Sequence, residues 1–350
     1  MKNKNNDLFT LDKFIEDSLY NKKHGYYMKK NPFGRGGDFI TAPNISILFS
    51  EMIAIWIISF WEKLDCPKQF NLIELGAGNG EMMRVMVNTF NKFSQFKKSC
   101  KINILEKSEL LKKTQKTNIK DTKIKWLNNL NDLNNFPCIF IANEFFDALP
   151  IKQFLKKEKK WYERCVNFAN DKKLAYLDIP FDMQKYEEKI KFKISRKQEF
   201  IEYSPLATKY LKTIMNKIQL NNGGILIIDY AYLEKKMKNT LQAVSKHKYC
   251  DVLKSFRNSD ITYNLSFNLI NMIIKKLGPC SSTFTTQKKF LTELGILERA
   301  EILSKNMPFS KKADIYFRIK RLIDKRQMGH LFKVMLITNR KNKFNLGFLK

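Results

Sequence analysis

Short apolar runs recur along the middle of the chain, and polar segments with helical periodicity separate them. Four of these runs are predicted strands: residues 70–74, 101–106, 123–127 and 138–142. The intervening segments 81–93 and 108–117 are predicted helices. Short apolar strands that alternate with helices are typical of a mostly parallel sheet with helices on both faces. The pattern therefore predicts an α/β fold.

The second half of the chain continues this pattern after an interruption. Residues 223–230 are a predicted fifth strand, and a helix is predicted over residues 207–219. Residues 330–338 form another predicted strand, which we expect to pair antiparallel with a strand near 281–286. Such a pair would lie at one edge of the sheet.

The length of 350 residues exceeds the usual size of a single core, so inserted segments are expected. The stretch between the fourth and fifth strands is too long for a simple connection, and residues 159–182 predict a hairpin within it. We predict an N-terminal part over 1–69, with helices at 8–20 and 44–63 and a Gly- and Pro-rich lid loop at 24–43. The core is predicted over 70–155 and 206–350. An α+β subdomain is predicted to be inserted over 156–205, and a second insertion of mixed loop and helix over 231–275.

The formal net charge of +30 admits two interpretations. One is a polyanionic partner such as a nucleic acid or a membrane surface. The other is compositional drift, because 54 of the 64 basic residues are Lys and they are spread almost evenly. Nucleic-acid sites usually cluster their charge and use Arg for bidentate contacts. We therefore favour drift and do not expect nucleic acid as the partner.

The six cysteines have no C-x-x-C spacing, and the three histidines are far apart, so no metal site is expected. Scattered cysteines are typical of buried thiols in a reducing compartment. No apolar stretch reaches about 18 residues, the length that predicts a membrane span. The first residues lack the apolar segment of a secretory signal. These features predict a cytoplasmic protein.

The segment "IELGAGNGE" (73–81) follows the first strand and opens a helix, which is where doubly wound folds bind nucleotides. The dinucleotide fingerprint G-x-G-x-x-G does not fit, because the third Gly comes one residue early and Glu81 stands in its place. A carboxylate there would repel a pyrophosphate at the helix N-terminus. An acid that ends the strand, followed by G-x-G-x-G, suits S-adenosylmethionine, which has no phosphate and carries a cationic sulfonium.

The second strand ends at Glu106, whose two oxygens can accept both hydroxyl protons of a ribose. The end of the third strand is where an adenine edge would lie. Each feature alone has an interpretation without a ligand: the glycine segment could be only a turn, and Glu106 could be a solvated strand end. Their combination favours a nucleoside cofactor. The predicted cofactor-binding residues are Glu74, Gly76, Ala77, Gly78, Glu106, Ser108, Asn129 and Leu130.

The fourth strand is followed at once by Asn143, Glu144 and Asp147. Ligands of this fold lie at the carboxyl ends of the strands, so these residues are predicted to lie near the sulfonium. Carboxylates there suit a guanidinium acceptor, which they can bind bidentately and align for attack on the methyl group. The alternative is a helix N-cap cluster without a catalytic role. We predict these three residues as the catalytic set.

Several stretches together resemble the methyltransferase family of the mitochondrial-dysgenesis protein A and the complex I assembly factor. The more specific ones are "GDFITAP" (37–43) and "NEFFDALP" (143–150), and weaker matches extend over nearly the whole length. The resemblance implies a seven-stranded methyltransferase fold with a smaller inserted domain. It implies a protein arginine as acceptor, on a subunit of respiratory complex I. It also implies an active-site lid that contains Gly37, Asp38, Thr41 and Pro43.

The chain departs from the family pattern at several positions: Asn44 and Ser50 replace Glu and Gly, Phe256 and Arg257 replace Pro-Gly, and Asn264 and Ser266 replace His and Asp. The missing His puts catalysis in question more than cofactor binding. Two alternatives to an enzyme that methylates a protein therefore stay open. One is a non-catalytic assembly chaperone that binds the cofactor. The other is a nucleic-acid methyltransferase, which lacks support because no Pro-Pro follows Asn143.

Overall fold

The computed structural model describes residues 8–34, 37–121, 123–168 and 174–349. The chain divides into two compact units, each made of three segments. The first consists of Met1–Lys30, Phe146–Leu211 and Tyr232–Lys276. The second, which holds the larger sheet, consists of Asn31–Phe145, Lys212–Ala231 and Leu277–Lys350. Each unit is described below by itself.

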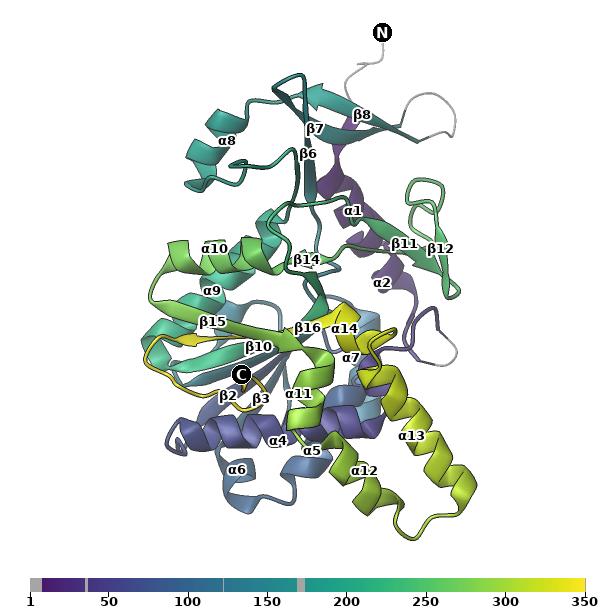
Figure 1. Cartoon of the computed structure of the whole chain (residues 1–350), viewed down its shortest axis with the longest axis vertical. Helices are drawn as coiled ribbons and strands as arrows, with labels where there is room; N and C mark the ends of the chain where they lie inside the picture. The colour runs from purple at the N-terminus through teal and green to yellow at the C-terminus, as the bar shows by residue number, and fades with distance from the viewer. Residues whose placement is uncertain (1–7, 35–36, 122, 169–173, 350) are drawn as a thin grey trace. The chain divides into compact units, whose positions relative to one another are not determined.

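The larger sheet follows the strand order β15-β16-β10-β5-β2-β3-β4 (Figure 1). Its strands are β2 (Phe70–Leu75), β3 (Cys100–Leu105), β4 (Lys125–Leu127), β5 (Cys138–Asn143), β10 (Gly223–Tyr232), β15 (Cys280–Thr286) and β16 (Phe332–Asn339). All six residues of β2 and of β5 are buried, as expected for central strands of a sheet covered on both faces. The predicted α/β class and the predicted strands are confirmed.

Five of these strands pair in parallel, from β4 through β3, β2 and β5 to β10. β16 then pairs antiparallel with β10, and β15 pairs antiparallel with β16. The antiparallel edge pair predicted from residues 281–286 and 330–338 is therefore confirmed. The carboxyl ends of β2, β3 and β5 lie side by side, which brings the segments after them to one edge of the sheet.

Helices of the same unit cover the sheet. The longest helix before β2 is α4 (Ile47–Lys63). This helix is apolar on nearly every side and has eleven buried residues. Together with α5 it packs on one face of the sheet, and the second half of α9 lies on the other (Figure 1). The helices are α3 (Ala42–Ile45), α4 (Ile47–Lys63), α5 (Glu81–Phe90), α6 (Ser94–Ser99), α7 (Glu109–Ile119), the 3₁₀ turn η1 (Leu130–Asp132), α9 (Pro205–Asn221), α11 (Gln287–Glu293), α12 (Ile296–Ser304), α13 (Phe309–Ile323) and α14 (Met328–Leu331).

The smaller unit contains a second, antiparallel sheet in the order β1-β7-β6-β9, with β8 paired to β7. The predicted hairpin over 159–182 is the β7–β8 pair; the Asn-Asp turn expected there lies outside the described residues. The elements of this unit are β1 (Leu8–Thr10), α1 (Leu11–Tyr20), α2 (Tyr26–Lys29), β6 (Lys152–Lys157), β7 (Lys160–Asn167), β8 (Ala175–Pro180), α8 (Met183–Ile190), β9 (Phe200–Tyr203) and α10 (Phe267–Leu277).

The second insertion differs from its prediction of mixed loop and helix. Besides α10 it contains a three-stranded sheet in the order β12-β11-β13. These strands are β11 (Gln242–Ser245), β12 (Lys248–Cys250) and β13 (Asp260–Thr262), and the two-residue strand β14 (Leu265–Ser266) follows them. Strands of three or four residues are too short to show an alternating pattern in the sequence.

The compact units also divide the chain differently from the predicted domains. The first residues pair with the insertion, because β1 is antiparallel to β7. The lid loop from Asn31 onward and α4 instead belong with the larger sheet, whereas the first residues of the lid loop, up to Lys30, belong to the smaller unit. The two insertions form one unit, and its second segment begins at Phe146, ten residues before the predicted boundary at 156.

Ser50, which replaces the Gly usual in the family, is fully buried in α4, and its hydroxyl has no hydrogen-bond partner among the described residues. We expect Ser50→Ala to raise the free energy of unfolding by about 1 kcal/mol, because it removes an unsatisfied polar atom and improves helix propensity. Urea denaturation measures this change. Ser46→Ala is the matched control: it removes the cap in which Ser46 Oγ accepts from Leu48 N at 3.3 Å, so it should destabilise by about 1 kcal/mol. A loss of stability in Ser50→Ala would contradict the interpretation.

Candidate functional site

The loop after β2 has a backbone that requires glycine. Gly76, Gly78 and Gly80 have φ of +66°, +53° and +82°, in the left-handed region. A Cβ on Gly76 would lie 2.8 Å from the ring of Phe145. The N–H of Gly76 donates to the carbonyl of Leu105 at 2.9 Å, which fixes the loop to the end of β3. The loop is therefore a close turn of glycine backbone with no room for a side chain at Gly76.

The segment predicted as a lid folds tightly over this loop. Phe39 N donates to Pro32 O at 3.1 Å, and Gly34 N donates to Phe39 O at 2.9 Å. A Cβ on Gly37 would lie 2.1 Å from Pro32 O, so no other residue fits there. The ring of Phe33 lies 3.4 Å from the position of a Cβ on Gly78. An aromatic side chain of the lid thus covers the glycine loop.

Asn44 connects the lid to the glycine loop. Its Nδ2 donates to Thr41 Oγ1 at 2.9 Å, and its Oδ1 accepts from Asn79 Nδ2 at 2.9 Å. Asn79 in turn caps the start of α5, where Glu81 N donates to its Oδ1 at 3.2 Å. The family usually has Glu at position 44, whose carboxylate could accept from both the Thr41 hydroxyl and Asn79 Nδ2. The Asn found here bonds to the same two residues, so this departure preserves a connected lid.

The end of β5 contributes two of the predicted catalytic residues. Glu144 has φ +50°, which is unusual for a residue with a Cβ, and such strain clusters at functional sites. Its N–H donates to Ile228 O of β10 at 2.9 Å, which holds this conformation. Asn143 Nδ2 donates to Glu144 Oε1 at 3.2 Å. Asn143 Oδ1 is buried and has no hydrogen-bond partner among the described residues.

One small cavity joins these three parts of the larger unit. It is lined by the glycine loop, the lid and the end of β5: Phe33, Thr41, Pro43, Asn44, Glu74, Gly76, Ala77, Gly78, Asn79, Met82, Asn143 and Glu144. Its volume of about 40 Å³ has room for a few water molecules. A nucleoside therefore needs the lid segment around Phe33 to move. The sequence prediction had placed these three segments at one site, and the structure brings them together.

Glu74 is the buried acid of this cavity, and its Oε2 has no hydrogen-bond partner among the described residues. Burial, with a smaller contribution from the charge of Glu106, raises the pKa of Glu74 to about 8. A buried carboxyl of this kind favours a cationic partner, which would restore its ionised form. Two residues that line the cavity, Glu74 and Asn143, thus each have a buried side-chain oxygen without a hydrogen-bond partner among the described residues.

We expect Glu74→Gln to stabilise the ligand-free protein more at about pH 8 than at about pH 5.5. The unfolded chain ionises Glu74 above its usual pKa of 4.5, whereas the folded chain keeps the proton up to about pH 8. The free energy of unfolding therefore falls as pH rises through this window, and a Gln removes that loss. Urea denaturation at both pH values measures the difference. Glu109→Gln, which changes an exposed acid, is the control. An equal effect of Glu74→Gln at both pH values would contradict the raised pKa of Glu74.

Glu106, the predicted ribose ligand, is oriented by donors of the chain. Ser108 N donates to its Oε1 at 2.9 Å, and Gln115 Nε2 donates to its Oε2 at 2.9 Å. Gln115 Nε2 also donates to Gly78 O at 2.9 Å, and its Oε1 accepts from Trp126 Nε1 at 2.8 Å. Gln115 was not predicted, although it joins β4, Glu106 and the glycine loop. The sequence carries no signal for this role, because the full burial of Gln115 in α7 is apparent only in the structure.

The other predicted residues do not line the small cavity. Ser108 is buried as the N-cap of α7, with its Oγ accepting from Leu111 N. Asn129 and Leu130 follow β4 as expected, and Asn129 caps η1. Asp38 of the lid is buried. Asp147 is buried in the smaller unit, where its carbonyl accepts from Tyr263 N at 3.1 Å. The roles assigned to these residues stay predictions.

Two departures from the family pattern have local structural explanations in the smaller unit. Arg257, where Gly is usual, keeps φ +62° and binds Asp17 with two nitrogens, at 2.9 and 2.5 Å. Phe256 stacks on Phe14 with ring centroids 5.0 Å apart. Ser266, where Asp is usual, accepts from Leu269 N at 3.3 Å and so caps α10 as an Asp would.

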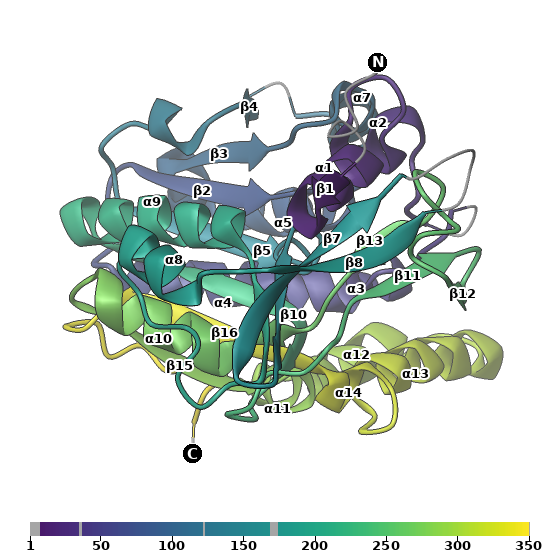
Figure 2. The ribbon, with the colours of Figure 1, turned by 90° about the horizontal axis from the view of Figure 1, so that it is seen from above.

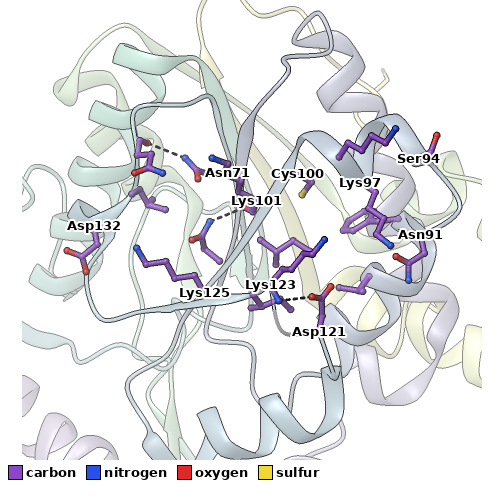
Figure 3. Close-up of a pocket in the computed structure, with 18 residues that line it drawn as sticks. Asn71, Asn91, Ser94, Lys97, Cys100, Lys101, Asp121, Lys123, Lys125 and Asp132 are labelled. Atoms are coloured by element: carbon purple, nitrogen blue, oxygen red, sulfur yellow. Dashed lines mark hydrogen bonds between the residues drawn. The ribbon is translucent and has the colours of Figure 1, made fainter.

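A larger cavity, of about 840 Å³, lies elsewhere (Figure 3). This cavity lies at the amino ends of β2 and β3, where it is lined by Asn71, Cys100 and Lys101. The glycine loop follows the carboxyl end of β2. Figure 3 shows Lys97, Lys123 and Lys125 around its mouth, and these lysines are exposed. Ligands of doubly wound folds bind at the opposite, carboxyl ends. We therefore do not assign this cavity to the site.

Curated relatives of this chain carry a consistent name. The chain is 26% identical to "Protein arginine methyltransferase NDUFAF7, mitochondrial" of Xenopus tropicalis, over 93% of this chain and 81% of that protein. It is 27% identical to the protein of the same name from Homo sapiens, over 92% of this chain and 78% of that protein.

A solved structure shares the fold. A "COG1565 superfamily member and likely methyl transferase" of Burkholderia thailandensis, bound to S-adenosyl-homocysteine, superposes with a TM-score of 0.81 at 22% identity. The match covers 98% of this chain and 90% of that one.

The residues of the site fit S-adenosylmethionine as cofactor. Glu81 in the first turn of α5 disfavours a phosphate at this helix N-terminus, and the buried Glu74 carboxyl suits a cationic ligand. Residues 52–284 match the family described as "Putative S-adenosyl-L-methionine-dependent methyltransferase". With the fold, the glycine loop and this match in agreement, the chain belongs to that family of S-adenosylmethionine-dependent methyltransferases.

Proposed function

We propose that this chain methylates an arginine side chain of a protein substrate. The observation that supports this most is the position of Glu144 and Asn143 on the cavity of the glycine loop. A carboxylate there suits a guanidinium, which stays protonated in water and binds carboxylates bidentately. The names of the relatives agree with this acceptor.

The bound cofactor supplies an electrophilic methyl group on a cationic sulfur. One guanidinium nitrogen forms the new N–C bond as the S–C bond breaks, and a proton leaves that nitrogen for solvent. The part proposed for Glu144 is to draw the positive charge of the guanidinium to one side and to orient the attacking nitrogen. Asn143, whose Nδ2 donates to Glu144 Oε1, would hold that carboxylate in place.

The family resemblance supports a subunit of respiratory complex I as the proposed target. The cytoplasm is the proposed location because scattered cysteines are typical of a reducing compartment. A non-catalytic assembly chaperone is the second candidate, favoured by Asn264 and Ser266 in place of the family's His and Asp. Ser266 caps α10, so at this position the structural role is kept.

The test combines binding with transfer. Isothermal titration should detect binding of S-adenosylmethionine, and a methyl-labelled cofactor added with cell lysate should label a protein band. Acid hydrolysis of that band should release methylated arginine. Binding without any labelled product would support the chaperone, whereas label on RNA would replace the proposal with a nucleic-acid methyltransferase. Absence of binding would contradict both main candidates.

A further inference from the structure

The hairpin formed by α12 and α13 exposes several large apolar side chains of the larger unit. Phe309 is 85% exposed, Ile302 is 68% exposed and Phe317 is 64% exposed. Leu297, Met307 and Tyr316 are also exposed, at 37 to 39%. We call these six residues the hairpin surface. A concentration of exposed apolar side chains in one hairpin is typical of an interaction site.

The spacing on α13 places its apolar residues together. Phe309 and Tyr316 are seven residues apart, so they lie nearly above one another on the helix. Ala313 and Phe317 continue the same exposed side at four-residue spacing. Phe309, Ala313, Tyr316 and Phe317 therefore share an arc of about 100°. Burial of the helix begins only toward its end, with Ile319 and Leu322.

Positive charge surrounds these apolar residues. From Ile296 to Ile323 the hairpin has seven basic residues and three acids, Glu298, Glu301 and Asp314, and Asp314 pairs with Arg318 at 2.8 Å. A cavity of about 600 Å³ beside Tyr316 is lined by Lys320 of the hairpin and by three further cations, Lys288, Lys325 and Arg326, with Asp324 as its acid. Its apolar lining includes Leu297, Ile319 and Ile323.

Charge and shape together decide between possible occupants. A second copy would place this positive surface against itself, because a two-fold contact uses the same patch twice. The occupant is therefore anionic. Ile302, Met307 and Phe309 belong to the turn between α12 and α13 or to the helix ends beside it. This turn lies at the outer end of the hairpin, away from the sheet (Figures 1 and 2). A protruding apolar end flanked by Lys is the pattern of a segment that enters a membrane interface, whereas a peptide ligand takes a groove.

We propose that the hairpin surface binds the protein peripherally to an anionic membrane. The aromatic side chains of α13 and Ile302 enter the interfacial layer, and the flanking lysines contact lipid phosphates. No helix of the described residues is long and apolar enough to cross a membrane, and this mode of binding needs none. The proposal is independent of the acceptor of the methyl group.

The experiment is sedimentation of the full-length protein with vesicles. Vesicles of phosphatidylcholine and phosphatidylglycerol at about seven to three should bind the protein, and phosphatidylcholine alone should bind it weakly. Phe309→Ser with Phe317→Ser should lower the partition coefficient about tenfold or more. Lys311→Glu with Lys312→Glu should lower it similarly. Circular dichroism and titration with S-adenosylmethionine verify that the variants fold.

Matched controls separate this surface from the general charge of +30. Leu220→Ser with Tyr249→Ser removes two residues that are 81% and 78% exposed elsewhere, and should not change binding. Lys275→Glu with Lys276→Glu reverses an exposed pair outside the hairpin and should have at most a small effect. Absent vesicle binding, or binding unchanged by the Phe substitutions, would overturn the proposal. So would a dimer in solution that only the Phe substitutions dissociate, or an acidic protein that displaces the vesicles at this surface.

Discussion

Gly76→Val is expected to weaken binding of S-adenosylmethionine about 100-fold or more, which corresponds to roughly 3 kcal/mol. Gly76 has φ +66°, and a β-branched residue is strongly disfavoured there. Its Cβ would also lie 2.8 Å from the ring of Phe145. The loop must then move from the end of β3, or Phe145 must move. Either change disturbs the cradle that the cofactor contacts, and isothermal titration measures the loss.

Gly295→Val is the matched control for backbone strain in this experiment. Gly295 has φ +81°, and its nearest neighbour to an added Cβ is the end of the Glu298 side chain at 3.5 Å. This variant should lose stability but keep its affinity for the cofactor. If both variants bind S-adenosylmethionine as the unchanged protein does, the glycine loop is not the cofactor cradle.

The strands and the glycine loop could be predicted because their signals are local. β2 and β5 are short runs of apolar residues that are buried on both faces, and such runs are recognisable without knowledge of their neighbours. The three positive φ angles of the loop coincide with the three glycines that the sequence displays. Because neighbouring strands of such a sheet are parallel, the sequence also predicted that Glu144, after β5, lies at the sheet edge that carries this loop.

The pairing of the first residues with the insertion was not predicted, because nothing in their local pattern indicates it. β1 and β7 pair although Leu8 and Asn167 are far apart in the chain, so the first residues belong with the insertion. Gln115 joins Glu106 to Gly78 through one amide, and a Gln inside an otherwise polar helix has no distinctive local signal. The helices α12 and α13 were not predicted either. Exposed aromatic residues such as Phe309 interrupt the single apolar face by which an amphipathic helix is recognised in a sequence.

Glu144→Gln is expected to lower the turnover of methyl transfer about 100-fold or more while leaving cofactor affinity nearly unchanged. In the proposed function, the carboxylate of Glu144 binds the guanidinium with two oxygens and aligns the attacking nitrogen. An amide of the same shape retains one acceptor oxygen and presents an NH₂ group to a cation. Loss of a positioned charged group of this kind typically costs about two orders of magnitude or more in rate. A methyl-labelled cofactor and the purified substrate protein measure turnover.

Two further variants and two contrary outcomes of Glu144→Gln distinguish catalysis from structure. Glu109→Gln changes an exposed acid that pairs with Lys112 at 2.8 Å, and it should leave turnover unchanged. Glu144→Asp keeps the charge on a shorter side chain and should recover part of the rate, since charge rather than shape orients the acceptor. If Glu144→Gln instead loses stability and cofactor binding together, the left-handed backbone at this position serves the fold. If its turnover is unchanged, the guanidinium is aligned by other groups and the proposed role of Glu144 is wrong.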